Sequence, residues 1–227
     1  MIKLEHTVLP SPEQMEFIIE GMRNPMNSWD KSDSYENFEV DYDKETGAEV
    51  HYPYYRVGAG DISLMKRLSK AGTAHRKYMR MMPVYVRITA PLYWWKEFDT
   101  YKVGTVANSC STMHKIQEKE FTLDDFSIEH LDDDRSAELS NVEWLEHLIH
   151  HLNRDRRRFI ETKDKKYWWQ MIQLLPSSYN QTRNVMLNYE VLFNIYHSRK
   201  NHKLDEWIEF CKWIKTLPYS ELITQED

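Results

Sequence analysis

The residues best suited to chemistry lie near the carboxyl end, in the stretch MLNYEVLFNIYHSR that ends at Arg199. The stretch lacks glycine and proline, and its apolar spacing predicts a helix over 185–199. On this helix Asn188 and Arg199 point into the middle of the apolar side, roughly three turns apart, while Glu190 faces away from it. A buried guanidinium and a buried amide are groups that bind a carboxylate, a phosphate or the polarised carbonyl of a ligand.

A structural explanation of the same two residues is equally compatible with their spacing. Removing a charge from water costs several kcal/mol unless the charge is paired. A buried ion pair between Arg199 and an acid on a neighbouring helix would meet that need, and Asn188 would then act as a cap. Arg199 also lies near the helix end, where the helix dipole favours a cation. The spacing alone leaves a ligand pocket and an ion pair as alternatives.

The segment EHLIHH contains residue pairs with the spacing of metal ligands. Glu146 with His150, and His147 with His151, are at i,i+4 positions, which brings both side chains of a pair to one helix face. The sequence offers no third ligand at a recognisable spacing. We therefore predict no metal site and expect a charged, solvent-exposed helix face.

Two further groups have both a functional and a plain interpretation. The basic run RDRRR at 154–158 has the charge to hold a phosphate, but its acidic neighbours favour a solvated helix face. Cys110 and His114 are a conceivable pair of nucleophile and base. No surrounding motif supports that pair, so the plain interpretation is favoured for both groups.

Length and composition predict one folded domain spanning 1–227. The chain has 227 residues, of which 41% are hydrophobic and 13% aromatic, enough for one substantial core. A net charge of −6 argues against binding to a nucleic-acid polymer, although a local basic pocket for one small anion is compatible with it. Two cysteines exclude a disulfide scaffold. No secretory signal or run of ~20 apolar residues is present, so we expect a cytoplasmic protein without a membrane partner.

The elements that must position the candidate residues are mainly helices. Ser11 as N-cap and Pro12 in the first turn predict a helix over 11–24. Between Pro83 and Pro91 apolar and polar residues alternate, which predicts a strand with one covered face. The KETG sequence predicts a hairpin turn. Further helices are expected at 60–72, at 203–217, and at 136–175, there as one helix or two. The pattern predicts a predominantly helical α+β domain.

One family has a sequence pattern that matches these residues. The segment LPSSYNQTRNVMLNYEVLFNIYHSR resembles the carboxyl-terminal signature of flavin-dependent thymidylate synthases, the ThyX family. The signature has an LP pair followed by N-x-x-x-L-x-N-x-x-x-x-R. It is matched without a gap by Pro176, Asn188, Leu192, Asn194 and Arg199.

The resemblance extends beyond this signature. Glu206 matches the Glu of the family's last helix, and residues 60–116 follow the order of its amino-terminal half. The resemblance is strongest over 60–116 and 174–218. It implies a ThyX-like single domain with a small central antiparallel sheet.

A second family signature, R-H-R-x-x-S-x-N-E-x-S-x-R-Y, is only partly kept. Asn108 and Ser111 match its Asn and second Ser, but Met113 and His114 stand where the family has Arg-Tyr. Tyr101-Lys102-Val103 stands in the place of Arg-His-Arg. If one extra residue is allowed in the loop, Thr100-Tyr101-Lys102 takes that place and Glu97 lies over the preceding Gln. The arginines are missing in both alignments.

The resemblance implies a function and a set of site residues. Family members are homotetramers with active sites at subunit interfaces, and they bind FAD and the nucleotide dUMP. They methylate C5 of the pyrimidine with methylenetetrahydrofolate, and NADPH reduces the flavin. The implied catalytic residue is Arg199, and the implied substrate-binding residues are Arg199, Ser111, Ser109 and Glu97. The implied cofactor-binding residues are Asn188, Asn194, Lys102, Tyr101, Asn108 and His114. The missing arginines suggest an alternative, an inactive binding or structural oligomer.

Overall fold

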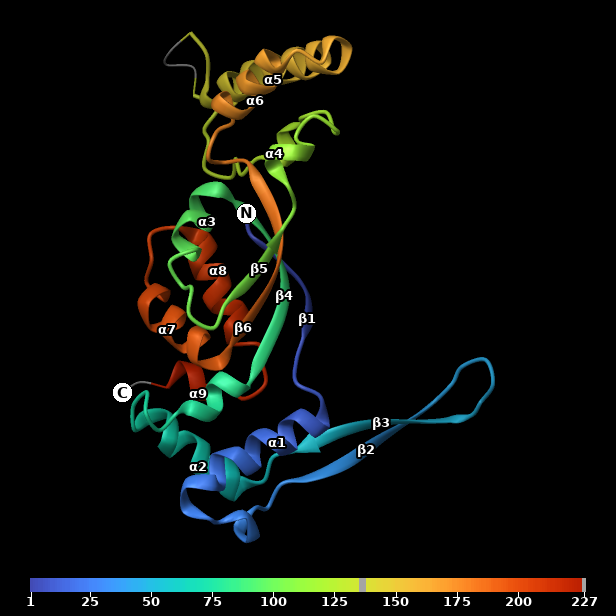
Figure 1. The fold of residues 1–227 in the computed structure, drawn as a ribbon, viewed down its shortest axis with the longest axis vertical. Helices are drawn as coiled ribbons and strands as arrows, with labels where there is room; N and C mark the ends of the chain where they lie inside the picture. Colours follow the sequence, from blue (N-terminus) through green and yellow to red (C-terminus); the bar gives the residue numbers. More distant parts are fainter. Residues whose placement is uncertain (135–137, 226–227) are drawn as a thin grey trace. The chain divides into compact units, whose positions relative to one another are not determined.

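The computed structural model describes residues 1–134 and 138–225 of the 227-residue chain. About half of these residues are helical, and strands form one four-stranded and one two-stranded sheet (Figure 1). The predicted α+β class, predominantly helical with a small antiparallel sheet, is confirmed. The helices are α1 Pro12–Arg23, α2 Ala59–Lys70, α3 Leu92–Phe98, α4 Thr112–Lys115, α5 Asn141–Thr162, α6 Lys165–Leu174, α7 Tyr189–Arg199, α8 Asp205–Ile214 and α9 Glu221–Thr224. The strands are β1 Lys3–Val8, β2 Tyr35–Tyr42, β3 Glu49–Arg56, β4 Pro83–Pro91, β5 Val106–Ser109 and β6 Asn180–Asn188. Short 3-10 helices span η1 Asn24–Met26, η2 Trp29–Lys31, η3 Lys77–Met81 and η4 Leu123–Asp125.

The described chain divides into two compact units. Unit 1 consists of residues 1–5, 87–101 and 107–185. Unit 2 consists of residues 6–86, 102–106 and 186–227, of which residues 226 and 227 are not described. The strand order in the larger sheet is β1-β4-β6-β5. The single-domain organisation of 1–227 stays a prediction.

The predicted strand and first helix form where their sequence signals place them. β4 runs from Pro83 to Pro91, and every second residue from Val84 onward is buried, as the alternation predicts. At the start of α1, Ser11 Oγ accepts a hydrogen bond from the main-chain N–H of Gln14 at 3.2 Å. Gln14 Oε1 accepts the Ser11 N–H in return at 2.9 Å, which completes a capping box.

The predicted helical segment 136–175 forms two helices in unit 1, α5 and α6. Residues 136 and 137, the first of that segment, lie outside the described residues. Lys163 ends α5 in the left-handed conformation, and Asp164 caps α6 by accepting the Lys166 N–H at 3.0 Å. The two helices cover a cluster of buried apolar side chains contributed by Ile116, Phe121, Phe126, Leu145, Ile149, Leu152 and Met171.

In unit 2, α7 packs against α8, α9 and the short 3-10 helix η3. The side chains that α7 and α8 bury most completely are Leu192, Ile195, Trp207, Phe210 and Ile214, each with 0% exposure. The main-chain N–H of Tyr189 donates to the carbonyl of Met82 at 3.1 Å. The beginning of α7 is thereby tied to the residue that precedes β4.

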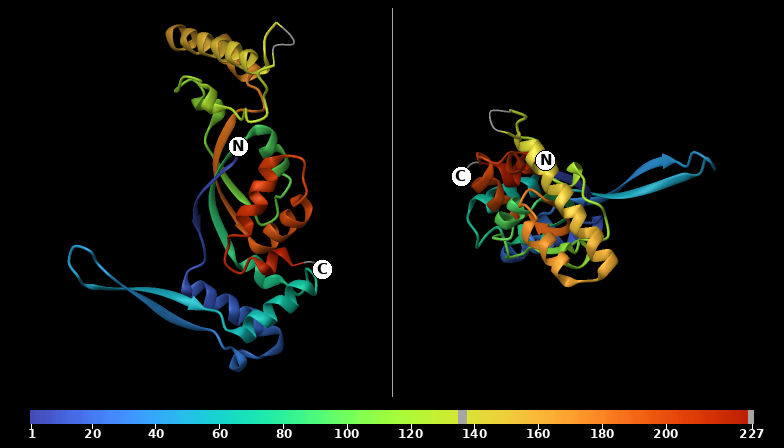
Figure 2. Two further views of the ribbon diagram at one scale, coloured as in Figure 1. Left: turned by 180° about the vertical axis from the view of Figure 1, so that it is seen from behind. Right: turned by 90° about the horizontal axis from the view of Figure 1, so that it is seen from above.

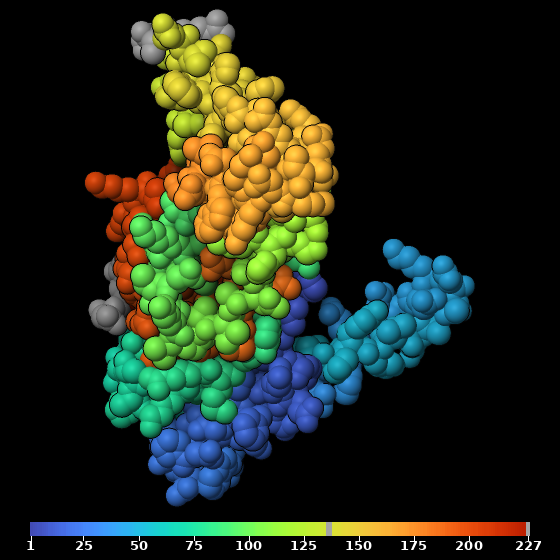
Figure 3. Space-filling view, turned by 45° about the horizontal axis from the view of Figure 1, so that its top comes forward, coloured from blue at the N-terminus to red at the C-terminus, as the bar shows by residue number. Residues whose placement is uncertain are grey.

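The predicted hairpin at KETG is formed by β2 and β3. The strands pair antiparallel from Tyr35 opposite Arg56 to Tyr42 opposite Glu49. Gly47 closes the turn with φ of +67°, a conformation that glycine adopts without strain. Figures 2 and 3 show the hairpin extending away from α1 and α2 of the same unit.

The base of the hairpin is fixed by the carboxylate of Asp61 on α2, which is fully buried. Arg23 donates to its Oδ1 at 2.7 Å. Its Oδ2 accepts the hydroxyls of Ser32 at 2.7 Å and Ser34 at 2.6 Å, and the main-chain N–H of Asp33 at 3.2 Å. A buried charge with this many partners holds the segment before β2 against α1 and α2.

Within the described parts of the chain, none of the helices combines the length and the apolar character needed to cross a bilayer.

Candidate functional site

The helix that carries the signature begins later than the sequence predicts. Residues 185–188 of the predicted helix belong to β6, and α7 begins at Tyr189. The prediction that Asn188 lies on the apolar side of the helix is therefore wrong. Asn188 is the N-cap, and its Oδ1 accepts the main-chain N–H of Val191 at 3.0 Å. This is the capping role that the spacing left open.

Glu190 is the second correction, because it faces the protein and not the solvent. Its side chain is 9% exposed and accepts hydrogen bonds from Arg76, whose Nε lies at 3.3 Å, and from Arg80. The Arg76 guanidinium carbon also lies 4.1 Å from the centroid of the Phe193 ring. The hydrogen bond and the charge of Glu190 raise the pKa of Arg80. Two arginines from the segment before β4 thus fix the first turn of α7.

Arg199 lies at the last position of α7 and is half-buried. Its guanidinium carbon is 5.0 Å from the centroid of the Trp207 ring on α8, close enough for a cation–π contact. Asn194, one turn earlier in the signature, is exposed, whereas Leu192 is completely buried. The matched signature residues therefore present different surroundings, and Arg199 is the charged one among them.

The loop 102–106 brings Lys102 into the same unit as Asn188 and Arg199. Gly104 has φ of +77°, and a Cβ at this position would lie 2.5 Å from Asn188 Nδ2. Asn188 Nδ2 donates to the Gly104 carbonyl at 3.4 Å, so the loop and the cap residue are linked directly. The buried hydroxyl of Thr105 has no hydrogen-bond partner in the described residues. This loop offers the exposed ammonium group of Lys102, which suits an anionic ligand.

The predicted phosphate-facing residues lie in unit 1, around β5 and α4. Ser109 ends β5, and Ser111 caps α4 by accepting the His114 N–H at 3.1 Å. Asn108, Ser109, Ser111 and His114 are all exposed. Two other candidates of this unit, Glu97 and Tyr101, lie on α3 and just after it.

The sequence analysis did not single out Arg183, which links strand β6 to the end of α3. Arg183 Nε donates to Gln181 Oε1 at 2.9 Å, and its Nη1 donates to Asp99 Oδ1 at 2.7 Å. Its guanidinium carbon lies 4.1 Å from the Trp95 ring centroid. Gln181 Nε2 in turn donates to the Cys110 carbonyl at 3.0 Å and to Thr112 Oγ1 at 2.9 Å. The only sequence signal was a run of polar residues, NQTRN, in a segment that proves to be a strand.

The candidate residues thus fall into two groups, one in each unit. Unit 2 holds Asn188, Asn194, Arg199 and Lys102, and unit 1 holds Ser109, Ser111, Asn108, His114, Glu97 and Tyr101. In unit 2, Asn188 is hydrogen-bonded to Gly104 in the loop that contains Lys102. In unit 1, Ser111 Oγ accepts a hydrogen bond from the His114 N–H. Their roles toward a ligand stay predictions.

The basic run and the histidine segment lie on α5. Arg154 pairs with Asp155 at 3.2 Å, Arg156 donates to the Gln117 carbonyl at 2.9 Å, and Arg157 lies 3.8 Å from a Glu120 oxygen. Three arginines of the run are therefore engaged by protein acids and carbonyls, and the Arg158 guanidinium carbon lies 5.6 Å from the Tyr167 ring centroid. Among residues 1–134 and 138–225, no group of three histidine, cysteine or acidic side chains is placed to hold a metal ion.

The two cysteines are free thiols in different surroundings. Cys110 is exposed, whereas Cys211 on α8 is buried. Burial raises the pKa of the Cys211 thiol to about 11. The two sulfur atoms form no disulfide with each other.

Comparison with known proteins shows that the chain has the fold of flavin-dependent thymidylate synthases. No family model matches the sequence, and no curated protein sequence matches it. Thymidylate synthase X (ThyX) from Helicobacter pylori, in a crystal structure with FAD and dUMP, is 15% identical with a TM-score of 0.64; the match covers 98% of this chain and 96% of that one. A second structure of that enzyme with FAD and dUMP gives 14% identity, 98% and 97% coverage and a TM-score of 0.62.

A related match is the UMP/dUMP methylase PolB from Streptomyces cacaoi bound with 5-Br dUMP. It is 12% identical, with 99% of this chain and 94% of that chain covered and a TM-score of 0.60. At such identities the likeness establishes the fold.

Proposed function

We propose that this chain is a ThyX-like flavoprotein that methylates C5 of a pyrimidine deoxynucleotide such as dUMP. The observation that carries the proposal is the coincidence of two independent likenesses. The fold matches, over 98% of the chain, a protein crystallised with FAD and dUMP. The gap-free signature runs from Pro176, just before β6, through β6 to Arg199 at the end of α7 in that same fold. A fold alone does not imply function, whereas matching residues at one place in the fold favour a shared ligand.

Under this proposal Arg199 is the residue that binds and polarises the pyrimidine. A guanidinium is the group suited to a carbonyl or an anion, and the Trp207 ring lies 5.0 Å from its central carbon. In unit 2, Lys102 supplies a positive charge for an anionic ligand. In unit 1, Ser109 and Ser111 supply exposed hydroxyls as proposed substrate contacts. Glu97 completes the proposed substrate contacts.

The proposed cofactor contacts come from the remaining candidates. One N–H of the Asn188 amide is engaged by Gly104, which leaves its second N–H for a flavin carbonyl. Asn194, Tyr101, Asn108 and His114 would contribute further hydrogen bonds. When bound and reduced by NADPH, FAD would supply the hydride that converts the transferred methylene to methyl. Methylenetetrahydrofolate would be the carbon donor and NADPH the reductant, and the assembly would be a homotetramer.

An inactive binding or structural oligomer is the second candidate, and a specific observation favours it. The arginines of the second family signature are absent, with Met113 and His114 in the place of Arg-Tyr. The Oδ1 of Asn188 also accepts the hydrogen bond that caps α7, and one N–H of its amide donates to the Gly104 carbonyl. Both features are compatible with a protein that has the ThyX-like fold and has lost the flavin and nucleotide chemistry.

Flavin binding separates the two candidates. We expect the purified protein to absorb like oxidised flavin after incubation with FAD and dUMP, and to oxidise NADPH when dUMP and methylenetetrahydrofolate are present. A colourless protein that takes up no FAD in the presence of dUMP would exclude the flavoenzyme. The same protein titrated with dUMP alone then distinguishes a nucleotide-binding relative from a purely structural one.

Arg199→Ala is the sharpest single substitution for this proposal. We expect it to abolish dUMP binding, measured by calorimetry, and to leave the urea unfolding midpoint close to that of the unmodified protein. The matched control is Arg157→Ala, which removes an exposed arginine from α5 and should leave dUMP binding unchanged. Global unfolding of Arg199→Ala would instead assign Arg199 to a structural ion pair.

A further inference from the structure

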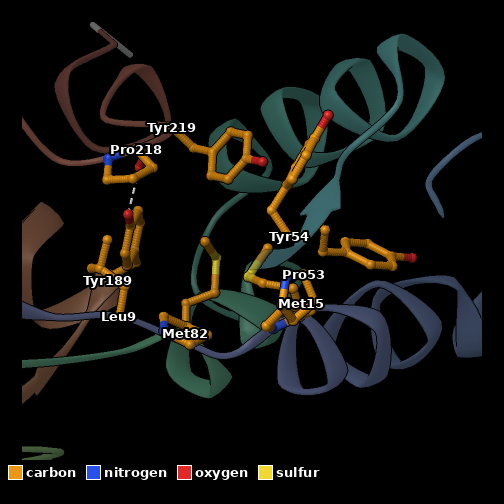
Figure 4. A pocket seen from close by; sticks show the side chains of 11 residues that line it. Leu9, Met15, Pro53, Tyr54, Met82, Tyr189, Pro218 and Tyr219 are labelled. Carbon is orange, nitrogen blue, oxygen red and sulfur yellow. Dashed lines mark hydrogen bonds between the residues drawn. The ribbon is translucent and has the colours of Figure 1, made fainter. Parts of the chain in front are cut away.

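Unit 2 contains a cavity of about 240 Å³ whose lining includes none of the candidate residues of the proposed function. It is shown in Figure 4 and lies between the start of α1, strand β3, the start of α7 and the loop that precedes α9. Its volume exceeds the roughly 150 Å³ of an engineered protein cavity that binds benzene. The cavity therefore has room for a small organic molecule.

Tyrosine rings form the walls of this cavity. Figure 4 shows the side chains of Tyr54, Tyr189 and Tyr219 around the space next to Met82. Tyr54 is 40% exposed, whereas Tyr189 is buried, so the cavity is open on the side of the hairpin. Aromatic faces carry negative partial charge, and several of them around one space attract a cation.

The rings are held in place by hydrogen bonds from other elements. The Tyr189 hydroxyl donates to the Pro218 carbonyl, and the Tyr54 hydroxyl accepts from Asn37 Nδ2 at 2.9 Å. A main-chain hydrogen bond from Val57 reaches the Tyr219 side chain. Binding would therefore require little ordering of the rings, which is the condition for affinity in a small site.

Tyr219 is also held in a strained backbone conformation. Its φ is +54°, in the left-handed region that bulky residues rarely adopt. Such strain persists only where the surroundings enforce it, and it concentrates at ligand-binding positions. Here it turns the Tyr219 side chain toward the cavity (Figure 4).

The charges around the cavity are acidic. Glu16 and Glu20 lie on α1 beside the lining residue Met15, and their charges raise the pKa of Tyr55 together with burial, which is the larger cause. Burial is the main reason that the pKa of Tyr219 is raised, and the charge of Glu221, two residues further along, raises it as well. Lys66 lies 3.6 Å from a Glu221 oxygen, and Arg56 follows the lining residue Tyr55 on β3. The surroundings therefore favour a positive ligand over a negative one.

We propose that this cavity binds a small organic cation with an alkylated ammonium group, placed against the faces of Tyr54, Tyr189 and Tyr219. The apolar lining of proline, leucine and methionine side chains accommodates the alkyl groups, which a strongly hydrated ammonium or a metal ion does not offer. This site is independent of the nucleotide chemistry proposed above.

The first experiment compares a cation with its neutral isostere on the full-length protein. Choline and 3,3-dimethyl-1-butanol have the same shape and differ in the charge of the central atom. We expect choline to bind about tenfold more tightly, measured by calorimetry or by broadening of the ligand methyl resonances. Equal binding of the two compounds, or no binding of choline, would overturn the proposal.

The second experiment removes one ring at a time from the hairpin. Tyr54→Leu should weaken choline binding about fivefold or more, and Tyr54→Phe should keep it within about twofold because the ring face remains. Tyr52→Leu is the matched control, since Tyr52 lies on the same strand, is 55% exposed and does not line the cavity. If Tyr54→Leu and Tyr52→Leu bind choline equally well, the ring of Tyr54 does not form the site.

Discussion

Replacing Gly104 by alanine tests the link between the loop 102–106 and the cap of α7. The residue has φ of +77°, and an alanine in the left-handed region costs roughly 1–2 kcal/mol. The new Cβ would also stand 2.5 Å from Asn188 Nδ2, so the amide must move. If its cap to Val191 is lost in the process, a further cost of about 1 kcal/mol follows. We expect a total loss of about 2–3 kcal/mol in the free energy of unfolding.

Gly72→Ala is the matched control for the backbone strain. Gly72 has φ of +93°, and a Cβ there would meet no heavy atom within 4 Å. Urea unfolding followed by tryptophan fluorescence should therefore show a loss of only about 1–2 kcal/mol. The difference between the two variants measures the displacement of Asn188.

A double-mutant cycle of Gly104→Ala and Asn188→Ala tests whether the two residues are coupled. In an Asn188→Ala background the obstructing amide is gone, so Gly104→Ala should cost no more than Gly72→Ala does in the unmodified protein. If the cost of Gly104→Ala is the same with and without Asn188, within about 0.5 kcal/mol, the two residues are not coupled. The proposed contact between loop and cap would then be refuted.

Two further substitutions address stability. Asp61→Ala should destabilise the fold by about 3–5 kcal/mol, because it leaves the guanidinium of Arg23 buried and unpaired, whereas the exposed control Asp30→Ala should stay within about 0.5 kcal/mol in the same urea titration. For Cys211 the folded pKa of about 11 lies above the ordinary value of 9.0, so the native state keeps its proton longer and the free energy of unfolding should fall as pH rises between these values. Unfolding curves measured across that range should show a smaller fall for Cys211→Ala, and an identical fall in both proteins would contradict the assignment.

Local signals in the sequence were enough for the elements whose ends are set by neighbouring residues. Ser11 and Pro12 fixed the start of α1, and two prolines bracketed β4, because capping and proline geometry act within one turn or one strand. The junction of β6 and α7 was different. Apolar residues continue across it, so helical spacing could be traced back to Val185 although the chain is extended as far as Asn188.

The environment of Glu190 could not be derived from spacing for a related reason. Its partners Arg76 and Arg80 are 114 and 110 residues away in the chain, and only the fold brings them together. Arg183 was missed in the same way, because its contact with Asp99 joins β6 to the end of α3. The signature predicted the positions of polar and charged residues. Partners that are distant in the sequence decide which of these side chains already form ion pairs or hydrogen bonds within the protein.

The hairpin β2–β3 has a consequence for how this chain tolerates change in length. Its strands are hydrogen-bonded to each other over their whole length, and its anchor to the rest of unit 2 lies at the base, at Asp61. Removing or adding a cross-strand pair near the turn therefore alters neither the core nor that anchor. We therefore expect the turn around Gly47 to accept an inserted epitope, a fluorophore or a natural insertion of residues without disturbing the folded interior.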